Sequence, residues 1–358
     1  MTHPPSSTTS RQWLIRISKT FEHFSSEIIA DLGATLTKRL GDEYYLLQSP
    51  GFNTSCNAAR YIRWNLPMEH TWPCNPEKME GFIEKAAQTL LKKFSEQKPQ
   101  GIFIGRLDAS SPRRYYKSLA TNLRGRTIPL FTQAVGHLKD VEDQDPKKDS
   151  LFCLLGREGL FCGIQSPLAA NGFYPGGTKF ISQKAAHTIS RAGAKIAEAL
   201  HYLKLHRTLP KAGSHWLELG ACPGGMTSEL LERNYQVTAV DRAPLDVRLK
   251  NRKGLHFSKA DVTRFNPPVK AKYDAILCDM NGEAEISLGQ VIRLSQYFRK
   301  GGLVVFTLKT PGTTGYQEMN TLFHTAAGSA KNSGLKLLAS THLTYNRHEF
   351  TLFFERNY

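Results

Sequence analysis

The sequence lacks the features that mark membrane proteins, secreted proteins and zinc proteins. No apolar run is long enough to cross a membrane, and the first ten residues are polar, without the hydrophobic segment of a signal peptide. The six cysteines are scattered, with no Cys-x-x-Cys pair and no neighbouring histidine ligands, so neither a disulfide framework nor a metal site is indicated. We therefore expect a cytosolic protein that binds no metal and no membrane.

Acidic residues are scarce beside basic ones. The chain of 358 residues has 47 lysines and arginines against 31 aspartates and glutamates, which gives a net charge of +16. Such an excess favours a large polyanionic partner, a nucleic acid, although a generally solvated basic surface is the alternative. The length suffices for two or three domains, and the composition is that of a globular protein.

The glycine motifs of dinucleotide-binding and phosphate-binding loops are also absent. In place of Gly-x-Gly-x-x-Gly or Gly-Lys-Ser/Thr, an apolar strand at 216–219 runs into a turn that is followed by a helical pattern. Glycines let a backbone approach a ligand closely, and the helix start offers unpaired N–H groups. The turn predicts a nucleotide-type pocket formed by Gly220, Ala221, Cys222, Pro223, Gly224 and Gly225.

Two aspartates at strand ends indicate which cofactor this pocket takes. Asp241 ends the strand at 236–240, about twenty residues after the first glycine, where a carboxylate accepts hydrogen bonds from ribose hydroxyls. Asp261 follows the strand at 255–257 and is placed to meet an adenine amino group. A glycine turn with two carboxylates and no phosphate-binding motif fits S-adenosylmethionine, which we expect to be the cofactor.

The second half of the chain alternates strands and helices, which predicts an α/β fold with a mainly parallel sheet and helices on both faces. Further strands are expected at 273–278, 302–308, 335–343 and 350–354, the last two as an antiparallel edge hairpin. Helices are expected at 184–205, 285–299 and 317–332. Seven strands in this order predict a Rossmann-like domain over residues 169–358.

The first half is expected to form two smaller α+β units behind a disordered leader at 1–10. The unit at 11–70 has expected strands at 13–17 and 44–47, a helix at 22–32 and an apolar segment at 58–64. The unit at 71–168 has an expected amphipathic helix at 79–94, a strand at 101–104 and a hairpin at 151–155 and 159–164. Residues 165–178, rich in proline and glycine, are expected to be a linker.

Basic residues alternate with tyrosines between residues 113 and 126. Arginine and lysine donate charge-assisted hydrogen bonds to phosphates, and the tyrosines can stack on unpaired bases. A solvated loop and helix face is an equally open interpretation. The candidate RNA-binding residues are Arg113, Arg114, Lys117, Arg124 and Arg126.

Four charged residues are candidates for the reaction itself. In an open α/β sheet the ligand lies beyond the carboxyl ends of the strands, where Asp279 ends the fourth strand and Lys309 the fifth. Lys195 lies off the apolar line of its helix, and Glu349 opens the last strand. Around the glycine turn, the four resemble the Lys-Asp-Lys-Glu tetrad of the FtsJ-type ribose 2′-O-methyltransferases.

The resemblance implies a class I, S-adenosylmethionine-dependent methyltransferase domain with these four catalytic residues, of which Asp279 also contacts the cofactor. Within the family, the chain is most similar to enzymes that methylate a cytidine ribose of 23S rRNA, in which a ferredoxin-like unit and a THUMP RNA-binding region come first. It implies 23S rRNA or its precursor as partner, and not DNA, which lacks the 2′-hydroxyl. We expect Lys309 to be the general base. Glu218 departs from the family, where Asp is more usual.

Other functions stay open. The fourth strand ends without the Asn/Asp-Pro-Pro-Tyr that is typical of base amino methyltransferases. Cytosine C5 methylation needs a nucleophilic cysteine, and Cys278 is expected to face away from the pocket because its neighbour Asp279 faces it. The same ribose chemistry on tRNA or another rRNA site, and an RNA-binding ribosome-assembly factor without turnover, are the alternatives. A nicotinamide dehydrogenase is disfavoured by the glycine spacing.

Overall fold

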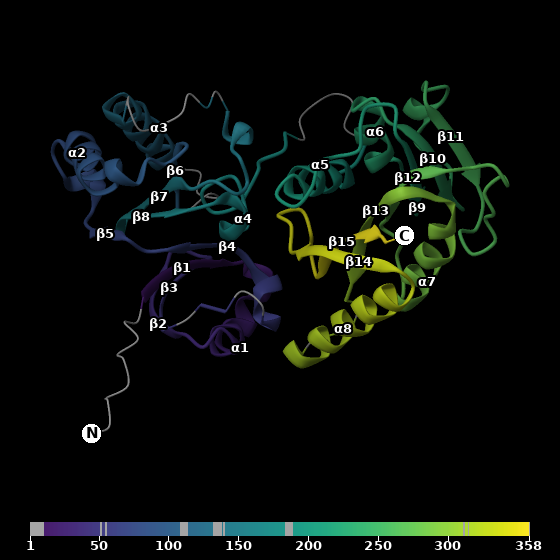
Figure 1. Cartoon of the computed structure of the whole chain (residues 1–358), viewed down its shortest axis with the longest axis horizontal. Coiled ribbons are helices and arrows are strands. Elements are labelled where there is room, and N and C mark those ends of the chain that lie inside the picture. Colours follow the sequence, from purple (N-terminus) through teal and green to yellow (C-terminus); the bar gives the residue numbers. More distant parts are fainter. Residues whose placement is uncertain are drawn as a thin grey trace. The chain divides into compact units, whose positions relative to one another are not determined.

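The computed structural model consists of two units, residues Met1–Thr178 and Lys179–Tyr358 (Figure 1). It describes residues 11–50, 52–53, 56–107, 114–131, 138, 140–182, 189–310, 312–313 and 315–357. The expected leader at 1–10, Arg113 and the first residues of the helix expected at 184–205 lie outside these ranges.

The first unit begins with a four-stranded antiparallel sheet in the order β2-β3-β1-β4. Its strands are β1 (Arg11–Ile17), β2 (Thr35–Leu40), β3 (Tyr44–Ser49) and β4 (Ile62–Pro67). The helix α1 (Ser25–Asp31) follows a 3-10 turn. Ile28 and Ile29 of the helix are buried, and so is Phe21 of that turn. The expected strands at 13–17 and 44–47 are confirmed, whereas β2 was not predicted.

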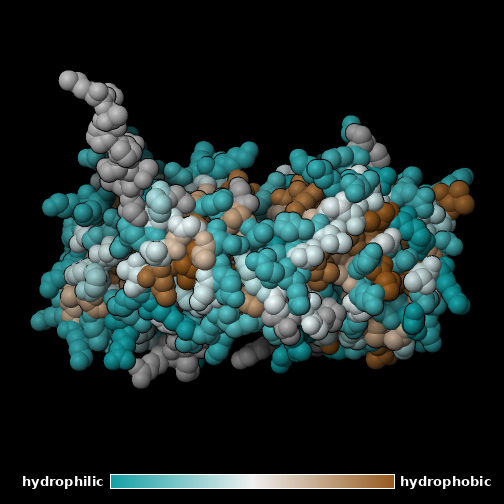
Figure 2. All heavy atoms as spheres, turned by 90° about the horizontal axis from the view of Figure 1, so that it is seen from below, coloured by the Kyte–Doolittle hydropathy of each residue, from teal (hydrophilic) through white to brown (hydrophobic). Residues whose placement is uncertain are grey.

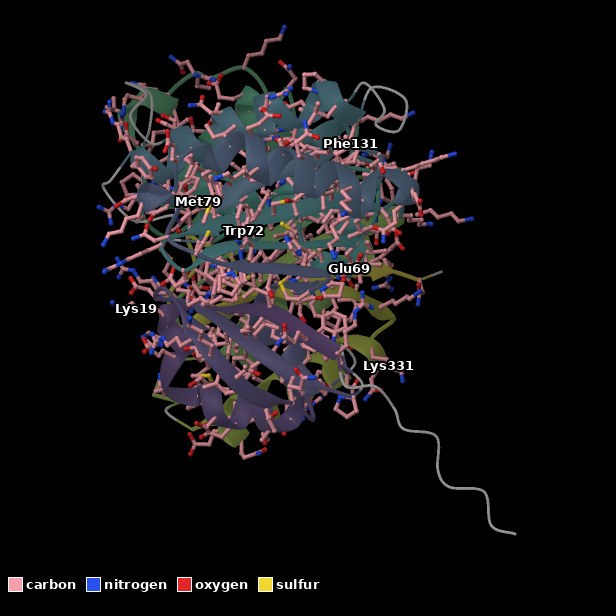
Figure 3. All side chains as sticks on the ribbon, turned by 90° about the vertical axis from the view of Figure 1, so that its left-hand side faces the viewer. Lys19, Glu69, Trp72, Met79, Phe131 and Lys331 are labelled. Carbon is pink, nitrogen blue, oxygen red and sulfur yellow. The ribbon has the colours of Figure 1, made fainter. Side chains whose placement is uncertain are left out.

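A second sheet follows, in the order β5-β8-β7-β6. Its strands are β5 (His70–Pro73), β6 (Ile102–Arg106), β7 (Ser150–Gly156) and β8 (Gly159–Gln165), of which only β6 and β7 pair in parallel. The helices α2 (Phe82–Phe94) and α3 (Tyr115–Thr127) pack on it through one apolar cluster, against which Trp72 and Met79 also lie (Figure 3). The amphipathic helix and the hairpin are confirmed, and β5 was not predicted.

The two sheets of this unit share a core. Phe103 and Phe152 of the second sheet belong to the same buried cluster as Leu14 and Trp64 of the first, and Trp64 meets Phe152 edge to face. Residues 165–178, expected to be a linker, instead join this unit. They contain α4 (Pro167–Ala170), and the Asn171 side chain donates to the Ile62 carbonyl at 3.0 Å.

The second unit is a seven-stranded mixed sheet in the order β11-β10-β9-β12-β13-β15-β14. Its strands are β9 (His215–Leu219), β10 (Gln236–Asp241), β11 (Leu255–Lys259), β12 (Tyr273–Cys278), β13 (Phe298–Lys309), β14 (Leu335–Thr341) and β15 (Glu349–Arg356). Its helices are α5 (Ala192–Leu203), α6 (Gly225–Glu232), α7 (Ala284–Leu294) and α8 (Tyr316–Asn332). In Figure 1, α5 and α6 lie on one side of the sheet and α7 and α8 on the other.

The predicted Rossmann-like α/β fold is confirmed by this strand order. The first five strands run parallel, and β15 inserts between β13 and β14, antiparallel to both. The helix expected from residue 184 begins at Ala192, because residues 189–191 are not helical. The helix expected to reach residue 299 is shorter, since β13 already begins at Phe298. The predicted subdivision of the first half, with a THUMP-like part, stays a prediction.

Figure 2 shows one face on which hydrophilic residues predominate and hydrophobic residues form small separate clusters. None of the helices in the described part of the chain has the length and apolar character that a membrane crossing requires.

Candidate active site

The four residues of the expected tetrad come together at one edge of the second unit's sheet. The Lys195 ammonium lies 3.1 Å from Asp279 Oδ2 and 2.6 Å from Glu349 Oε1. The Lys309 ammonium lies 3.4 Å from Asp279 Oδ1. The four side chains are only 11% to 21% exposed, so the tetrad is a mostly buried cluster of two cations and two carboxylates.

Strand register positions three of these residues. Lys309 ends β13 directly opposite Glu349, the first residue of β15, in the antiparallel ladder. Asp279 follows β12, whose last residue Cys278 pairs with Phe306 of β13. Lys195 reaches the same edge from the first turn of α5. The carboxyl ends of parallel strands meet at one edge of a sheet, which is where ligands bind in folds of this type.

Asn281 is a member of the cluster that the sequence did not reveal. Lys309 Nζ donates a hydrogen bond to Asn281 Oδ1 at 2.7 Å, the shortest of its polar contacts described here. The signal in the sequence was the position of Asn281 two residues after Asp279, at the same strand end. The contact directs the Lys309 amine toward the loop that follows β12.

The charge of Lys195 is stabilised by its surroundings. Burial lowers the pKa of Lys195, but the Asp279 and Glu349 carboxylates raise it by more, so the net pKa lies above its ordinary value. Lys195 is therefore a cation at neutral pH. As a cation it pairs with the two carboxylates, and it is not suited to accept a proton.

The glycine turn between β9 and α6 has the backbone shape that its sequence predicts. Gly220 and Gly224 adopt positive φ values of 78° and 103°, which other residues rarely adopt. A Cβ on Gly220 would lie 3.1 Å from Met280 Cγ, and one on Gly225 would strike Ser190 Oγ. The two glycines thus allow Met280 and Ser190 to pack closely against the turn, which leads into the N-terminus of α6.

Asp241 and Asp261 lie at the two neighbouring strand ends, as expected. Asp241 Oδ2 accepts from the Cys222 backbone N–H at 2.9 Å, so this carboxylate fixes the middle of the glycine turn, which contains the cis peptide between Cys222 and Pro223. Hydrogen bonds from Thr263 are the main cause of a lowered pKa at Asp261, which is therefore ionised at neutral pH.

Neither cysteine near the site is an activated nucleophile. Cys278 is fully buried, and burial raises the pKa of its thiol to about 12. Burial and the Asp241 carboxylate also raise the pKa of Cys222, whose sulfur contacts the Pro244 carbonyl. Both thiols are protonated at neutral pH, which argues against methylation through a cysteine adduct.

The expected RNA-binding residues fall into two groups in the first unit. Arg124 donates to the Ile102 carbonyl at 2.8 Å and lies over the Phe103 ring, and Arg126 forms a two-pronged ion pair with Glu84. The remaining described residues, Arg114, Lys117 and the neighbouring Tyr115, are exposed at the start of α3. Arg126 is exposed as well, but its guanidinium is paired with Glu84, so we expect the second group to be the more available for RNA.

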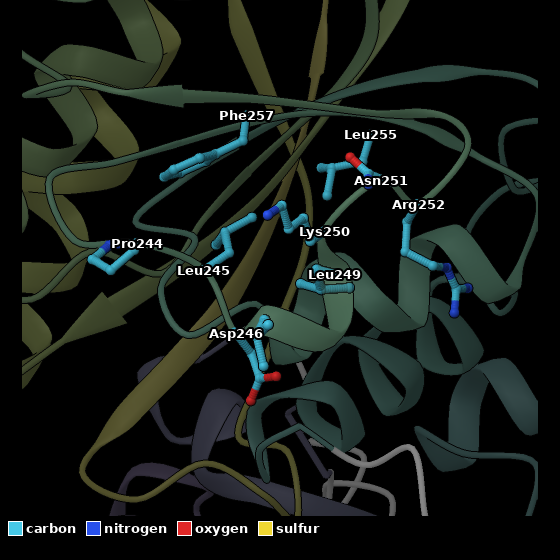
Figure 4. Close-up of a pocket in the computed structure, with 10 residues that line it drawn as sticks. Pro244, Leu245, Asp246, Leu249, Lys250, Asn251, Arg252, Leu255 and Phe257 are labelled. Atoms are coloured by element: carbon cyan, nitrogen blue, oxygen red, sulfur yellow. The ribbon is translucent and has the colours of Figure 1, made fainter.

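A cavity of about 410 Å³ lies apart from the tetrad, between β11 and the loop that precedes it. Figure 4 shows Phe257, Leu245 and Lys250 around it. That loop contains only the short 3-10 helix Val247–Leu249, and Leu249 packs against the backbone of Gly224. No residue of the tetrad or of the glycine turn lines this cavity, so it is not the reaction centre.

Glu218, the unusual residue of the motif, is buried in β9. It is 2% exposed and accepts a 2.7 Å hydrogen bond from Thr227 Oγ1 of α6. Burial raises the pKa of the Glu218 carboxyl to about 8, although the Thr227 hydrogen bond works in the opposite direction. The carboxyl is thus mostly neutral at pH 7 and links β9 to α6.

The sequence around this site matches a known family. Residues 188–307 fit the model of the FtsJ-like methyltransferase family. The chain contains an FtsJ-like methyltransferase domain. The resemblance predicted from the tetrad and the glycine turn is therefore confirmed, and the matched region extends from just before α5 to near the end of β13.

Curated relatives extend the match beyond this domain. Ribosomal RNA large subunit methyltransferase M of Shewanella loihica is 28% identical over 244 residues, which cover 66% of this chain and 66% of the relative. The protein of the same name from Shewanella frigidimarina is 27% identical over 285 residues, covering 75% and 77%. The chain thus spans about two thirds of the length of the first of these relatives.

Solved structures are more distant. The fibrillarin pre-rRNA processing protein of Methanococcus jannaschii has 15% sequence identity and a TM-score of 0.36, over 62% of this chain and 85% of that one. The fibrillarin of Aeropyrum pernix, solved with bound S-adenosylmethionine, has 17% identity and a TM-score of 0.35, over 60% and 85%. Both scores are low, so the fold assignment rests on the strand order itself.

The raised pKa of Glu218 predicts a pH-dependent contribution to stability. Between about pH 4.3, where a free glutamate titrates, and pH 8, the folded chain binds a proton that the unfolded chain releases, so Glu218 destabilises the fold as pH rises. Glu218→Gln, which does not titrate, should gain stability relative to the wild type from pH 5 to pH 8, by at most about 1.4 kcal/mol per unit. Urea unfolding at each pH measures this difference.

The exposed Glu285→Gln serves as a control for loss of one carboxyl in the same unit, and its stability should follow that of the wild type across this range. Parallel stability curves for Glu218→Gln and the wild type would contradict the assignment of a neutral, buried carboxyl to Glu218.

Proposed function

We propose that this chain transfers a methyl group from S-adenosylmethionine to the 2′-hydroxyl of an RNA ribose, with a cytidine of 23S rRNA as its substrate. The observation that carries the proposal is the assembled Lys195-Asp279-Lys309-Glu349 cluster beside the glycine turn of an FtsJ-like domain. The curated relatives, which are named as ribosomal RNA large subunit methyltransferases, support the choice of RNA.

The residues around the glycine turn fit the cofactor. Gly220 and Gly224 give the turn the positive φ values that its sequence predicts, Asp241 would accept hydrogen bonds from the ribose hydroxyls, and Asp261 would accept one from the adenine amino group. Asp279 is common to this site and the tetrad. When bound, S-adenosylmethionine supplies a methyl group on a positively charged sulfur, and that charge disappears on transfer.

The tetrad has to activate a poor nucleophile. Lys309 accepts the proton of the 2′-hydroxyl as the oxygen attacks, and Asn281 holds the amine in place through the 2.7 Å hydrogen bond. Lys195, held as a cation, keeps the Asp279 and Glu349 carboxylates in fixed positions around the hydroxyl. Much of the rate enhancement then comes from holding the ribose oxygen in line with the methyl group.

The first unit supplies RNA binding in this proposal. It is the part in which a THUMP-like domain is expected, and Arg114, Lys117 and Tyr115 expose two cations and an aromatic ring side by side at the start of α3. Cations bind phosphates regardless of sequence, and the ring offers a surface on which an unpaired base stacks. The 2′-hydroxyl requirement excludes DNA as a substrate.

Incubation with methyl-labelled S-adenosylmethionine and total RNA from a strain without the gene tests the reaction. We expect label in one 2′-O-methylcytidine of 23S rRNA, located by nuclease digestion and mass spectrometry. Label on another ribose would keep the chemistry and change the substrate. Label on a base, or RNA binding with no transfer at all, would overturn the proposed reaction.

Lys309→Met should lower the methyl-transfer rate by at least about 100-fold, because the only proton acceptor assigned to the reaction is removed. Binding of cofactor and of RNA, measured by calorimetry, should stay within about threefold, since Lys309 lies outside the glycine turn and the first unit. Lys300→Met, an exposed lysine on the same strand, should retain full activity. A Lys309→Met enzyme with wild-type turnover would refute the general-base role.

Arg114→Ala combined with Lys117→Ala should weaken RNA binding and reduce the slope of log affinity against log salt by about 1.5 to 2, because two phosphate contacts disappear. The matched control is Lys92→Ala with Lys93→Ala, which removes two exposed charges from α2 of the same unit. Equal salt slopes for the two double variants would show that the start of α3 makes no special contact with RNA.

A further inference from the structure

Helix α5 carries a buried acidic side chain one helical turn from Lys195 of the tetrad. Glu198 lies three residues after Lys195, about one helical turn, and is 1% exposed. A buried carboxylate is costly unless hydrogen bonds or charges compensate it. No step assigned to the tetrad uses Glu198, so its position requires another explanation.

The Glu198 carboxylate is bound by the loop that joins β14 to β15. Thr344 Oγ1 donates to Glu198 Oε1 at 2.7 Å, and the Tyr345 backbone N–H donates to Glu198 Oε2 at 3.4 Å. Thr344 and Tyr345 are separated from Glu198 by 146 and 147 residues in the sequence. The contact therefore joins the helix that carries Lys195 to the loop that leads into Glu349.

The same loop is tied to the other tetrad residues at its far end. The His348 carbonyl accepts from the Thr310 backbone N–H at 3.3 Å and from Thr310 Oγ1 at 2.7 Å, directly after Lys309. Asn346 Nδ2 donates to the Glu349 carbonyl at 3.1 Å. A shift of this loop would therefore displace both Glu349 and the end of β13.

We propose that Glu198 is a positioning residue of the active site. By holding the 342–348 loop, its carboxylate sets the distance of Glu349 from Lys195. Glu198 binds neither cofactor nor RNA in this role, which rests on the proposed methyl transfer. Misplacement of reacting groups by about 1 Å is enough to lower a rate about 100-fold, so loosening this loop should be visible in turnover.

The 342–348 loop has a second attachment to the second unit, through the side chain of Tyr345. The Tyr345 hydroxyl donates to the Ile181 carbonyl at 3.1 Å and accepts from the Ile181 N–H at 2.9 Å. These bonds do not involve Glu198. Loss of the Glu198 contact should therefore loosen the Thr344 end of the loop without releasing it from the second unit.

Thr344→Val tests the proposal, because valine has the shape of threonine and lacks the hydroxyl that Glu198 accepts from. We expect kcat to fall at least about tenfold with KM for S-adenosylmethionine and affinity for RNA unchanged. Deuterium exchange at residues 342–349 should rise severalfold. Thr344→Ser restores the hydroxyl and should recover kcat and protection, and Glu198→Ala should reproduce the effects of Thr344→Val.

Thr321→Val is the matched control, since it removes an exposed hydroxyl that bonds only to the Gln317 carbonyl within α8 in the contacts described here. It should leave kcat and loop protection unchanged. Unchanged exchange at 342–349 in both Thr344→Val and Glu198→Ala would overturn the proposal, as would increased exchange with unaltered kcat. If the wild type transfers no methyl group, the proposed function fails, whereas the exchange measurement still decides whether Glu198 holds the loop.

Discussion

The site depends on one ammonium group that two carboxylates share. Lys195 lies 3.1 Å from Asp279 and 2.6 Å from Glu349, and all three side chains are mostly buried. Without this cation, two like charges would face each other at the sheet edge, and removal of one member of a buried ion pair typically costs about 3–5 kcal/mol. The same interaction brings together α5, the end of β12 and the start of β15. The contacts that neutralise the charges are therefore also the contacts that assemble the site.

The register of the sheet fixes the positions of the site residues along their strands, which the ion pairs alone do not fix. Cys278 is flanked by Leu219 of β9 and Phe306 of β13, so the glycine turn and the residue before Asp279 lie at one level of the sheet. The antiparallel pairing of β15 then places Glu349 opposite Lys309. Ladder hydrogen bonds allow few alternative registers, because a slip of one residue would turn buried side chains to the opposite face.

Much of this arrangement could be predicted from the sequence, since it depends on local patterns. Apolar runs predicted every strand of the second unit, and strand ends pointed to Asp241, Asp279 and Lys309. The strand β2 escaped prediction because five of its six residues are exposed, which leaves no alternation of apolar and polar residues. The contacts of Glu198 with Thr344 and of Arg126 with Glu84 could not be predicted, because hydrogen bonds between distant segments have no local signature in the sequence.

The place of β15 between β13 and β14 has a consequence for biosynthesis. A ribosome releases Lys195, Asp279 and Lys309 well before Glu349, and the strand that carries Glu349 must enter between two strands already made. Until residue 356 has emerged, β13 and β14 have no partner between them, and Lys195 has only one of its two carboxylates. The nascent chain therefore has no complete tetrad until this strand has been made and has docked between β13 and β14.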